Sequence, residues 1–315
     1  MEKLRIVFMG TPEFAVGILD TIIKSNYEVV GVITAADKPA GRGQMLKYSA
    51  VKEYALDHNL NLLQPTNLKD ETFLSELQSL NANLQVVVAF RMLPEAVWRM
   101  PKLGTFNLHA SLLPNYRGAA PINWAIINGE TKTGVTTFFI DDKIDTGAMI
   151  LSKEIEISTE ENAGALHDRL MVLGSTAVIE TLALLEKGDV KTIIQKDNSE
   201  IRTAYKLNRE NCKVDWTKSA TEIHNLIRGL SPYPCAWCII KNNGEEWSVK
   251  LFEAKIITEN HTLKIGQIIT SKQDIKVAVK DGFIQIVSLQ LPGKKKMLTK
   301  ELLNGITFSE KAQAE

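Results

Sequence analysis

The 315-residue sequence has few cysteines and no long apolar run. It contains three cysteines, Cys212, Cys235 and Cys238, and this odd, low number favours a reducing cytoplasm. The first nine residues are too short and too soon interrupted by charge to form a secretory signal. No stretch approaches the roughly 18 apolar residues that a membrane span needs. We therefore expect a cytoplasmic protein with no membrane association.

The sequence also lacks the spacing of a metal site or a dinucleotide site. Its five histidines are scattered, with no i, i+4 pair and no cysteines beside them. Only Gly10 follows the first predicted strand, so the G-x-G-x-x-G fingerprint is missing. Cys235 and Cys238 lie in a predicted strand bounded by prolines and have no second pair, which argues against zinc or redox chemistry. We predict no metal, and NAD binding is disfavoured.

The net charge is zero, but the charges are unevenly distributed. Residues 190–315 hold 20 Lys and Arg against 14 Asp and Glu, whereas residues 1–189 hold 17 against 23. A basic C-terminal part favours a polyanionic partner. A solvated lysine-rich face explains the same charges at least as well, so charge alone leaves the partner open.

The N-terminal part has the pattern of an open α/β sheet. Residues 4–9 form an apolar-rich run typical of a strand that is buried on both faces. Thr11, Pro12 and Glu13 suit the start of a helix that runs to about residue 24, and a strand follows at 28–34. Further predicted elements are strands at 84–90, 133–140 and 148–157 and helices at 49–58, 70–80, 119–128 and 162–187.

The C-terminal part has a different pattern. The periodicity weakens at 190–208, which we interpret as a linker, and a helix is predicted at 219–230. Short strand-like segments separated by Gly and Asn turns then predict a small barrel of the OB type, a fold that often binds nucleic acid. These segments are 236–241, 246–257, 266–270, 275–279 and 283–289. We divide the chain into an N-terminal domain (1–189), the linker (190–208) and a C-terminal domain (209–315).

A polar pair lies where one predicted strand runs into a loop. Side chains at i and i+2 share a face of a strand, so Asn107 and His109 point the same way. Open α/β sheets build their sites at such strand ends. An amide donor beside an imidazole suits a reaction whose transition state carries an oxyanion. A buried Asn and His satisfied by backbone groups is the alternative, and the pair alone does not exclude it.

Asp145 follows the next strand along the chain. Because successive ends of parallel strands converge at one edge, we expect Asn107, His109 and Asp145 to meet. A carboxylate favours the protonated form of a nearby imidazole, and a protonated His beside an amide stabilises an oxyanion. From the residues alone, the hypothesis extends no further than acyl-type transfer.

The segment 35–47 is rich in Gly and Pro and carries Lys38, Arg42 and Lys47. This composition predicts an exposed, mobile loop. A simple connection explains it equally well, although its position after a strand leaves a functional role open.

These motifs, in this order and spacing, resemble the signature of the folate-dependent formyltransferases over nearly the whole chain. The similar segments are Asn107-Leu108-His109, Ser111 to Pro114, Gly118, Asp145-Thr146-Gly147, 8–12, 37–43, 117–122, the Pro232-x-Pro234-x-x-Trp237 turn and 292–295.

The resemblance implies a Rossmann-like catalytic domain followed by an OB-like tRNA-binding domain. It implies transfer of the formyl group of 10-formyltetrahydrofolate to the α-amino group of methionine on initiator tRNA, for translation initiation, by a monomer that binds no DNA. The implied catalytic residues are Asn107, His109 and Asp145. The implied folate-binding residues are Phe90, Met92, Leu93, Ser111, Leu112, Leu113, Pro114, Ile140, Asp141 and Asp142. The implied tRNA-binding residues are Lys38, Arg42, Lys294, Lys295 and Lys296.

One segment departs from the family pattern. Many members have a Gly-containing turn where this chain has Arg91-Met92-Leu93-Pro94, and Arg91 either contacts folate or points to solvent. The alternative functions are another folate-dependent formyltransferase, acting on a purine precursor or an amino sugar, a formyl-folate hydrolase and a non-catalytic RNA-binding protein.

Overall fold

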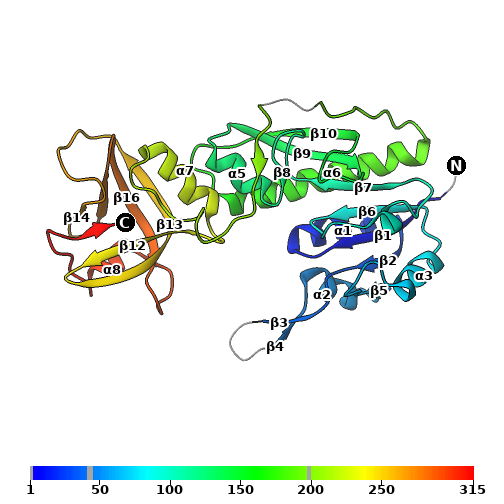
Figure 1. The fold of residues 1–315 in the computed structure, drawn as a ribbon, viewed down its shortest axis with the longest axis horizontal. Coiled ribbons are helices and arrows are strands. Elements are labelled where there is room, and N and C mark those ends of the chain that lie inside the picture. The colour runs from blue at the N-terminus through cyan, green and yellow to red at the C-terminus, as the bar shows by residue number, and fades with distance from the viewer. Residues whose placement is uncertain (1–2, 41–44, 197–199) are drawn as a thin grey trace. The chain divides into compact units, whose positions relative to one another are not determined.

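The computed structural model describes residues 3–40, 45–196 and 200–315 (Figure 1). The chain forms two compact units. The first comprises Met1–Pro121, Thr133–Ile155 and His167–Thr203, and the second comprises Ile122–Lys132, Glu156–Leu166 and Ala204–Glu315. The domain boundaries drawn from the sequence stay a prediction.

A seven-stranded sheet in the order β10-β9-β7-β6-β1-β2-β5 forms the centre of the first unit. Its strands are β1 (Arg5–Gly10), β2 (Glu28–Ile33), β5 (Leu62–Leu63), β6 (Leu84–Val88), β7 (Thr105–His109), β9 (Lys132–Phe139) and β10 (Met149–Glu156). The neighbouring strands from β7 to β5 pair in parallel, whereas β9 runs antiparallel to β7. Every residue of β6 is buried, as expected of a central strand covered on both faces.

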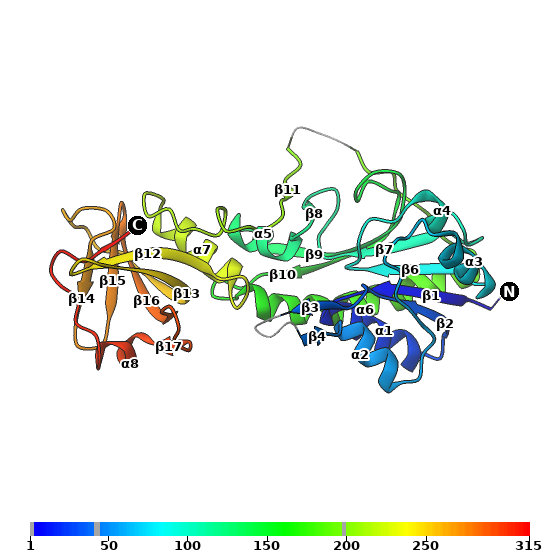
Figure 2. The ribbon, with the colours of Figure 1, turned by 60° about the horizontal axis from the view of Figure 1, so that its bottom comes forward.

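Helices cover both faces of this sheet (Figure 2). On one face, α1 (Glu13–Lys24) packs closely on α6 (Ala163–Lys187), where Gly17 meets Met171. On the other face, α3 (Glu71–Ser79) and α4 (Glu95–Trp98) enclose a core cluster that includes Val87. A further helix, α2 (Ala50–Asp57), lies beside α1 and begins at Ser49, whose hydroxyl accepts the Lys52 amide. The helices therefore leave the ends of the strands as the place for a site.

The segment 35–47 was predicted to be an open loop, and this prediction was wrong in part. Short strands β3 (Lys38–Ala40) and β4 (Met45–Lys47) pair antiparallel. The base of this hairpin is fixed, because the Asp37 carboxylate pairs with the Lys52 ammonium and accepts a hydrogen bond from Gln64 Nε2 at 2.9 Å. The many Gly and Pro residues of this segment are typical of loops, so its sequence does not show the pattern of a strand. Arg42 lies outside the described residues.

An antiparallel barrel fills most of the second unit. Its strands are β12 (Ala236–Asn242), β13 (Glu245–Ile257), β14 (Ile268–Thr270), β15 (Ile275–Val279), β16 (Gly282–Gln290), β17 (Met297–Leu298) and β18 (Gln313–Ala314). The barrel is nearly closed because the Ile268 and Ala314 amides donate to Ala312 and Gly266 carbonyls. The predicted α/β domain followed by a small barrel is thus confirmed.

The remaining elements are short or flank the barrel. Helix α7 (Ala220–Leu230) starts with a capping box between Ser219 and Glu222 and packs on the barrel core. The others are β8 (Arg117–Gly118), α5 (Pro121–Ile127), β11 (Thr203–Ala204) and α8 (Thr299–Leu303). None of the helices in the described ranges has both the length and the apolar composition for crossing a membrane.

All three cysteines are free and buried in the second unit. Burial raises the pKa of the Cys238 thiol to about 12 and also raises the pKa values of Cys212 and Cys235. The thiolate is the reactive form, so burial and the raised pKa both slow attack by thiol reagents.

We predict that the thiols stay unreactive while the second unit is folded. Titration with a chromogenic disulfide reagent at pH 8 should label none of the three cysteines within minutes in buffer and all three in guanidinium chloride. Fast labelling of even one thiol in buffer would contradict this account of the barrel core.

Candidate active site

Asn107 and His109 lie at the carboxyl end of β7. The flanking Phe106 and Leu108 are buried, and Leu108 packs against Gly174 of α6. Because side chains alternate along a strand, Asn107 and His109 point to the opposite face of the sheet. Strands β6 and β7 end nearly together, with Val88 paired to Leu108. The polar pair therefore occupies the sheet edge where the sequence predicted a site.

Asn107 is half-buried, and its neighbours in the sheet are Val87 of β6 and Phe138 of β9. Within the described ranges its side-chain amide has no hydrogen-bond partner. Because Asn107 is partly exposed, its amide is available to bind an oxygen atom of a ligand.

The His109 ring is held by a backbone carbonyl. His109 is 6% exposed, and its Nε2 lies 2.7 Å from the carbonyl oxygen of Tyr116. A carbonyl only accepts, so Nε2 carries the hydrogen. Tyr116 adopts a left-handed φ of 62°, and its amide donates to the Arg202 carbonyl at 2.6 Å, which fixes the orientation of this turn.

Asp145 approaches the other ring nitrogen. Its Oδ2 lies 3.8 Å from His109 Nδ1 and accepts a hydrogen bond from the Gly118 amide at 2.9 Å. The predicted reason for this approach was wrong, because β9 is antiparallel to β7 and its end lies beside Phe106. The loop after β9 instead turns back and carries Asp145 to His109.

A glycine makes this reversal of the loop possible. A Cβ on Gly147 would lie 1.7 Å from the Phe139 carbonyl oxygen, so only glycine fits where the loop folds against the end of β9. Asp145 itself has a left-handed φ of 55°, an uncommon conformation for a residue with a side chain.

Sequence analysis missed Gln195, which lies in the segment predicted to be a linker. Its side chain is buried and bonds both to the loop that carries Asp145 and to Arg117. A single glutamine in a segment without periodicity leaves no pattern, and only the fold reveals these contacts.

The residues predicted to bind folate have different environments. Ser111 is fully buried, and its hydroxyl donates to the Asn115 carbonyl at 2.6 Å. Leu93 and Leu113 are also buried, whereas Phe90, Leu112, Pro114 and Ile140 are half-buried.

Three further folate candidates lie on the loops that follow β6 and β9. Met92 is 66% exposed, and Asp142 is also exposed. Asp141 accepts hydrogen bonds from the Lys143 amide and the Thr146 hydroxyl, which shape the loop before Asp145. The exposed and half-buried candidates are therefore the ones free to touch a ligand.

Arg91 has a structural role on the surface. Its guanidinium donates to the Pro65 carbonyl at 2.5 Å and the Thr66 carbonyl at 3.0 Å, and it lies 5.7 Å from the Phe90 ring centre. These bonds tie the loop after β6 to the loop after β5.

The predicted tRNA-binding lysines of the tail belong to the second unit. Lys294, Lys295 and Lys296 are exposed, and Lys296 Nζ lies 4.8 Å from the centre of the Phe252 ring. Lys38 lies in β3, and its side chain is not among those described.

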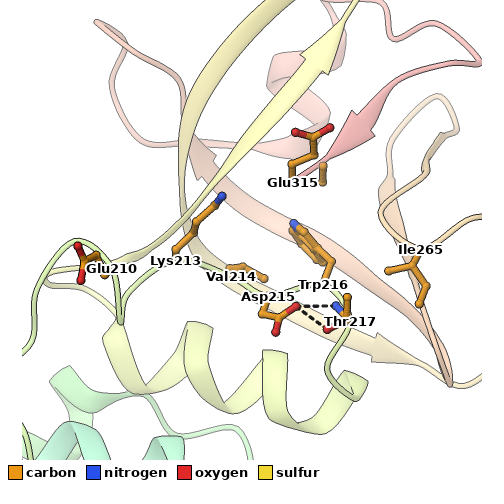
Figure 3. A pocket seen from close by; sticks show the side chains of 9 residues that line it. Glu210, Lys213, Val214, Asp215, Trp216, Thr217, Ile265 and Glu315 are labelled. Atoms are coloured by element: carbon orange, nitrogen blue, oxygen red, sulfur yellow. Dashed lines mark hydrogen bonds between the residues drawn. The ribbon is translucent and has the colours of Figure 1, made fainter.

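A separate pocket of about 420 Å³ lies on the second unit (Figure 3). Lys213, Trp216 and Glu315 are among its lining side chains, and Asp215 binds the Thr217 amide and hydroxyl. It contains none of the predicted site residues. In the ranges that the structure covers, no group of three or more His, Cys, Asp and Glu side chains is arranged to hold a metal ion.

Comparison with known proteins identifies the family. The sequence model of the formyl transferase family matches residues 4–182. The sequence model of the formyl transferase C-terminal domain matches residues 206–307. The chain belongs to the formyl transferase family. The resemblance inferred from the motifs is thereby confirmed.

Curated relatives are similar over their full length. A methionyl-tRNA formyltransferase of Flavobacterium johnsoniae is 75% identical over 99% of both chains. One of Bacteroides thetaiotaomicron is 53% identical over 98% of both chains.

Solved structures of formyl transferases and related proteins share the fold. WlaRD, a sugar 3N-formyl transferase, is 22% identical with a TM-score of 0.65, covering 94% of this chain and 100% of its own. HypX from Aquifex aeolicus, solved with tetrahydrofolic acid, is 18% identical with a TM-score of 0.66, covering 98% of this chain and 49% of its own.

We predict that Gly147→Ala lowers the rate of formyl transfer. The added methyl group must push the loop away from the Phe139 carbonyl and move Asp145 with it. A displacement of about 1 Å can cost on the order of 100-fold in rate. Steady-state kinetics should show the loss in kcat. Gly305→Ala should leave kcat unchanged, because its added methyl group would lie within 4 Å of no described atom beyond its chain neighbours. Equal kcat for both variants would contradict the role given to this close contact.

Proposed function

We propose that this protein transfers the formyl group of 10-formyltetrahydrofolate to the α-amino group of methionine esterified to initiator tRNA, for translation initiation. The observation that carries the proposal is the similarity over the whole chain, barrel included, to proteins named methionyl-tRNA formyltransferase. The arrangement of Asn107, His109 and Asp145 supports the chemistry. We expect the enzyme to act as a cytoplasmic monomer.

Asn107 acts on the charge that develops in the reaction. The neutral α-amine attacks the formyl carbon and produces a tetrahedral intermediate with an oxyanion. The unpartnered Asn107 amide is suited to donate a hydrogen bond to that oxygen, an interaction that is stronger in the transition state than in the ground state.

His109 acts through Nδ1, because Nε2 already donates to the Tyr116 carbonyl. A second proton on Nδ1 makes the ring cationic, and the Asp145 carboxylate oxygen lies 3.8 Å from that nitrogen. The bond between the amine and the formyl carbon forms, and the bond from that carbon to the folate nitrogen breaks. The amine loses one proton and the folate nitrogen gains one, and we assign this proton transfer to Asp145 and His109.

The folate candidates divide by their exposure. Phe90, Met92, Leu112, Pro114, Ile140 and Asp142 are exposed or half-buried and are our candidates for direct contact. Ser111, Leu93 and Leu113 are buried and support the loops, and Asp141 shapes the turn before Asp145.

Cations and aromatic rings alternate on the outer face of the barrel, as in surfaces that bind nucleic acid. The Arg209 guanidinium lies 4.1 Å and Lys213 Nζ 5.6 Å from the Trp237 ring centre. Trp237 pairs with Lys250 on β13, so these two side chains share a face of the sheet.

We name these residues, together with Lys296 and Phe252, the basic strip. We propose that the basic strip and Lys294 and Lys295 bind phosphates of the tRNA. Lys38 and Arg42 of the first unit are our candidates for contacts to its acceptor end.

The direct test of the function is to follow labelled formyl from the folate donor. We expect label on initiator methionyl-tRNA and not on water or free methionine. Release of formate at the same rate without tRNA would favour a formyl-folate hydrolase. Tight tRNA binding without transfer would favour a non-catalytic RNA-binding protein.

We predict that Asn107→Ala lowers kcat by about 100- to 1000-fold, because one oxyanion donor is lost. KM for both substrates should change little, since the hydrogen bond forms mainly in the transition state. Single-turnover transfer to methionyl-tRNA measures the effect. Asn61→Ala, which removes an exposed amide, is the matched control and should behave as wild type. Near-normal transfer by Asn107→Ala would remove this residue from the mechanism.

The basic strip has its own test. Replacing Lys250 and Lys296 by alanine should weaken tRNA binding and reduce the slope of log affinity against log salt by about 1.5, or roughly 0.7 to 0.9 for each lost phosphate contact. Lys272→Ala removes an exposed lysine elsewhere on the barrel and serves as the control. An unchanged salt slope in the double variant would show that the strip does not bind phosphate.

A further inference from the structure

The carboxamide of Gln195 uses its full hydrogen-bonding capacity inside the first unit. Its Nε2 donates to the carbonyl oxygens of Asp145 at 3.0 Å and Gly147 at 2.8 Å. Its Oε1 accepts from Arg117 Nε at 3.0 Å and Nη2 at 2.8 Å. An amide offers two donor hydrogens and two acceptor sites, so all four are satisfied. Gln195 is only 9% exposed, and its neighbour Ile194 is 80% exposed, so the glutamine side chain faces inward.

The two loops that Gln195 joins are the ones that hold the His109 ring. On one side, Tyr116 precedes Arg117 directly, and its carbonyl accepts the His109 Nε2 hydrogen bond. On the other side, Asp145 faces His109 Nδ1. The Gly118 amide also binds the Asp145 carboxylate, so a closed network of hydrogen bonds links Gln195, Arg117, Gly118 and Asp145 beside the histidine.

Within this hydrogen-bond network, the backbone of Asp145 has an unfavourable conformation. A left-handed φ is costly for a residue with a side chain, and a loop in that conformation needs outside contacts to stay there. Gln195 supplies them on the backbone of Asp145 and of Gly147, and leaves the Asp145 carboxylate free to face the histidine.

We propose that Gln195 is a positioning residue for formyl transfer. It holds the Asp145 carboxylate and the Tyr116 carbonyl on the two nitrogens of His109, and this role rests on the proposed function. The segment around Gln195 is therefore part of the active-site scaffold.

Two variants separate the contacts of this residue. Gln195→Met keeps the length of the side chain and removes all four hydrogen bonds. Gln195→Glu keeps an acceptor for Arg117 and removes the donors to Asp145 and Gly147. We expect both to lower kcat by about 10- to 100-fold while KM for both substrates stays within about threefold.

The matched control is Gln85→Met. Gln85 is a buried glutamine of the same unit, hydrogen-bonded to Thr105 at the other end of β7. We expect it to lose thermal stability and to keep kcat. An equal loss of kcat in Gln85→Met and Gln195→Met would overturn the proposal, since general destabilisation would then explain both.

A double-mutant cycle shows whether Gln195 acts through Asp145. In an Asp145→Asn background, Gln195→Glu should lower kcat by less than about threefold, because the carboxylate that Gln195 positions is already gone. The full loss, multiplied on top of the Asp145→Asn effect, would contradict the proposal.

Hydrogen–deuterium exchange decides the structural part independently of activity. Peptides covering residues 141–148 should exchange faster in Gln195→Met than in wild type, and Gln85→Met should leave them unchanged. Unchanged exchange in Gln195→Met would overturn the proposal. If the exchange results are as expected but wild type transfers no formyl group to methionyl-tRNA, the proposed function fails. The conclusion that Gln195 holds the loop carrying Asp145 in place would still stand.

Discussion

One buried hydrogen bond, from His109 Nε2 to the carbonyl of Tyr116, determines how the site works. It fixes the tautomer of the ring and leaves Nδ1 facing the Asp145 carboxylate. The turn that presents this carbonyl is itself held in place, by Arg202 on the Tyr116 amide and by the Ser111 hydroxyl on the Asn115 carbonyl. Several residues near the motif therefore serve the orientation of one imidazole.

The second constraint is the return of the loop after β9. Because β9 is antiparallel to β7, β9 ends beside Phe106, whereas His109 lies at the other end of β7. Close packing of Gly147 on Phe139 and the hydrogen bonds of Gln195 carry Asp145 back to His109. The carboxylate thus reaches the ring through a loop held at several points, and the sheet alone does not bring the two together.

The pattern of side chains along the sequence predicted many of the helices and strands and the position of the candidate site. The apolar run of β1 followed by Pro12 and Glu13, the alternating strands of the barrel, and the Asn107-x-His109 pair all carry a local signal. Other features carry no local signal in the sequence, because they depend on contacts between distant segments or on backbone atoms. These are the direction of β9, the hairpin of β3 and β4, and the roles of Gln195 and the Tyr116 carbonyl. The hydrogen bond from the Ser111 hydroxyl to the Asn115 carbonyl is likewise a contact with a backbone atom that the motif does not reveal.

The most direct test of this account is the tautomer of His109, measured by ¹⁵N–¹H correlation spectra of labelled imidazoles and assigned with a His109→Gln variant. The account predicts a proton on Nε2, held in a hydrogen bond to the Tyr116 carbonyl and protected from exchange. A neutral ring with its proton on Nδ1 and a bare Nε2 would contradict it, because the Tyr116 carbonyl would then have no hydrogen to accept.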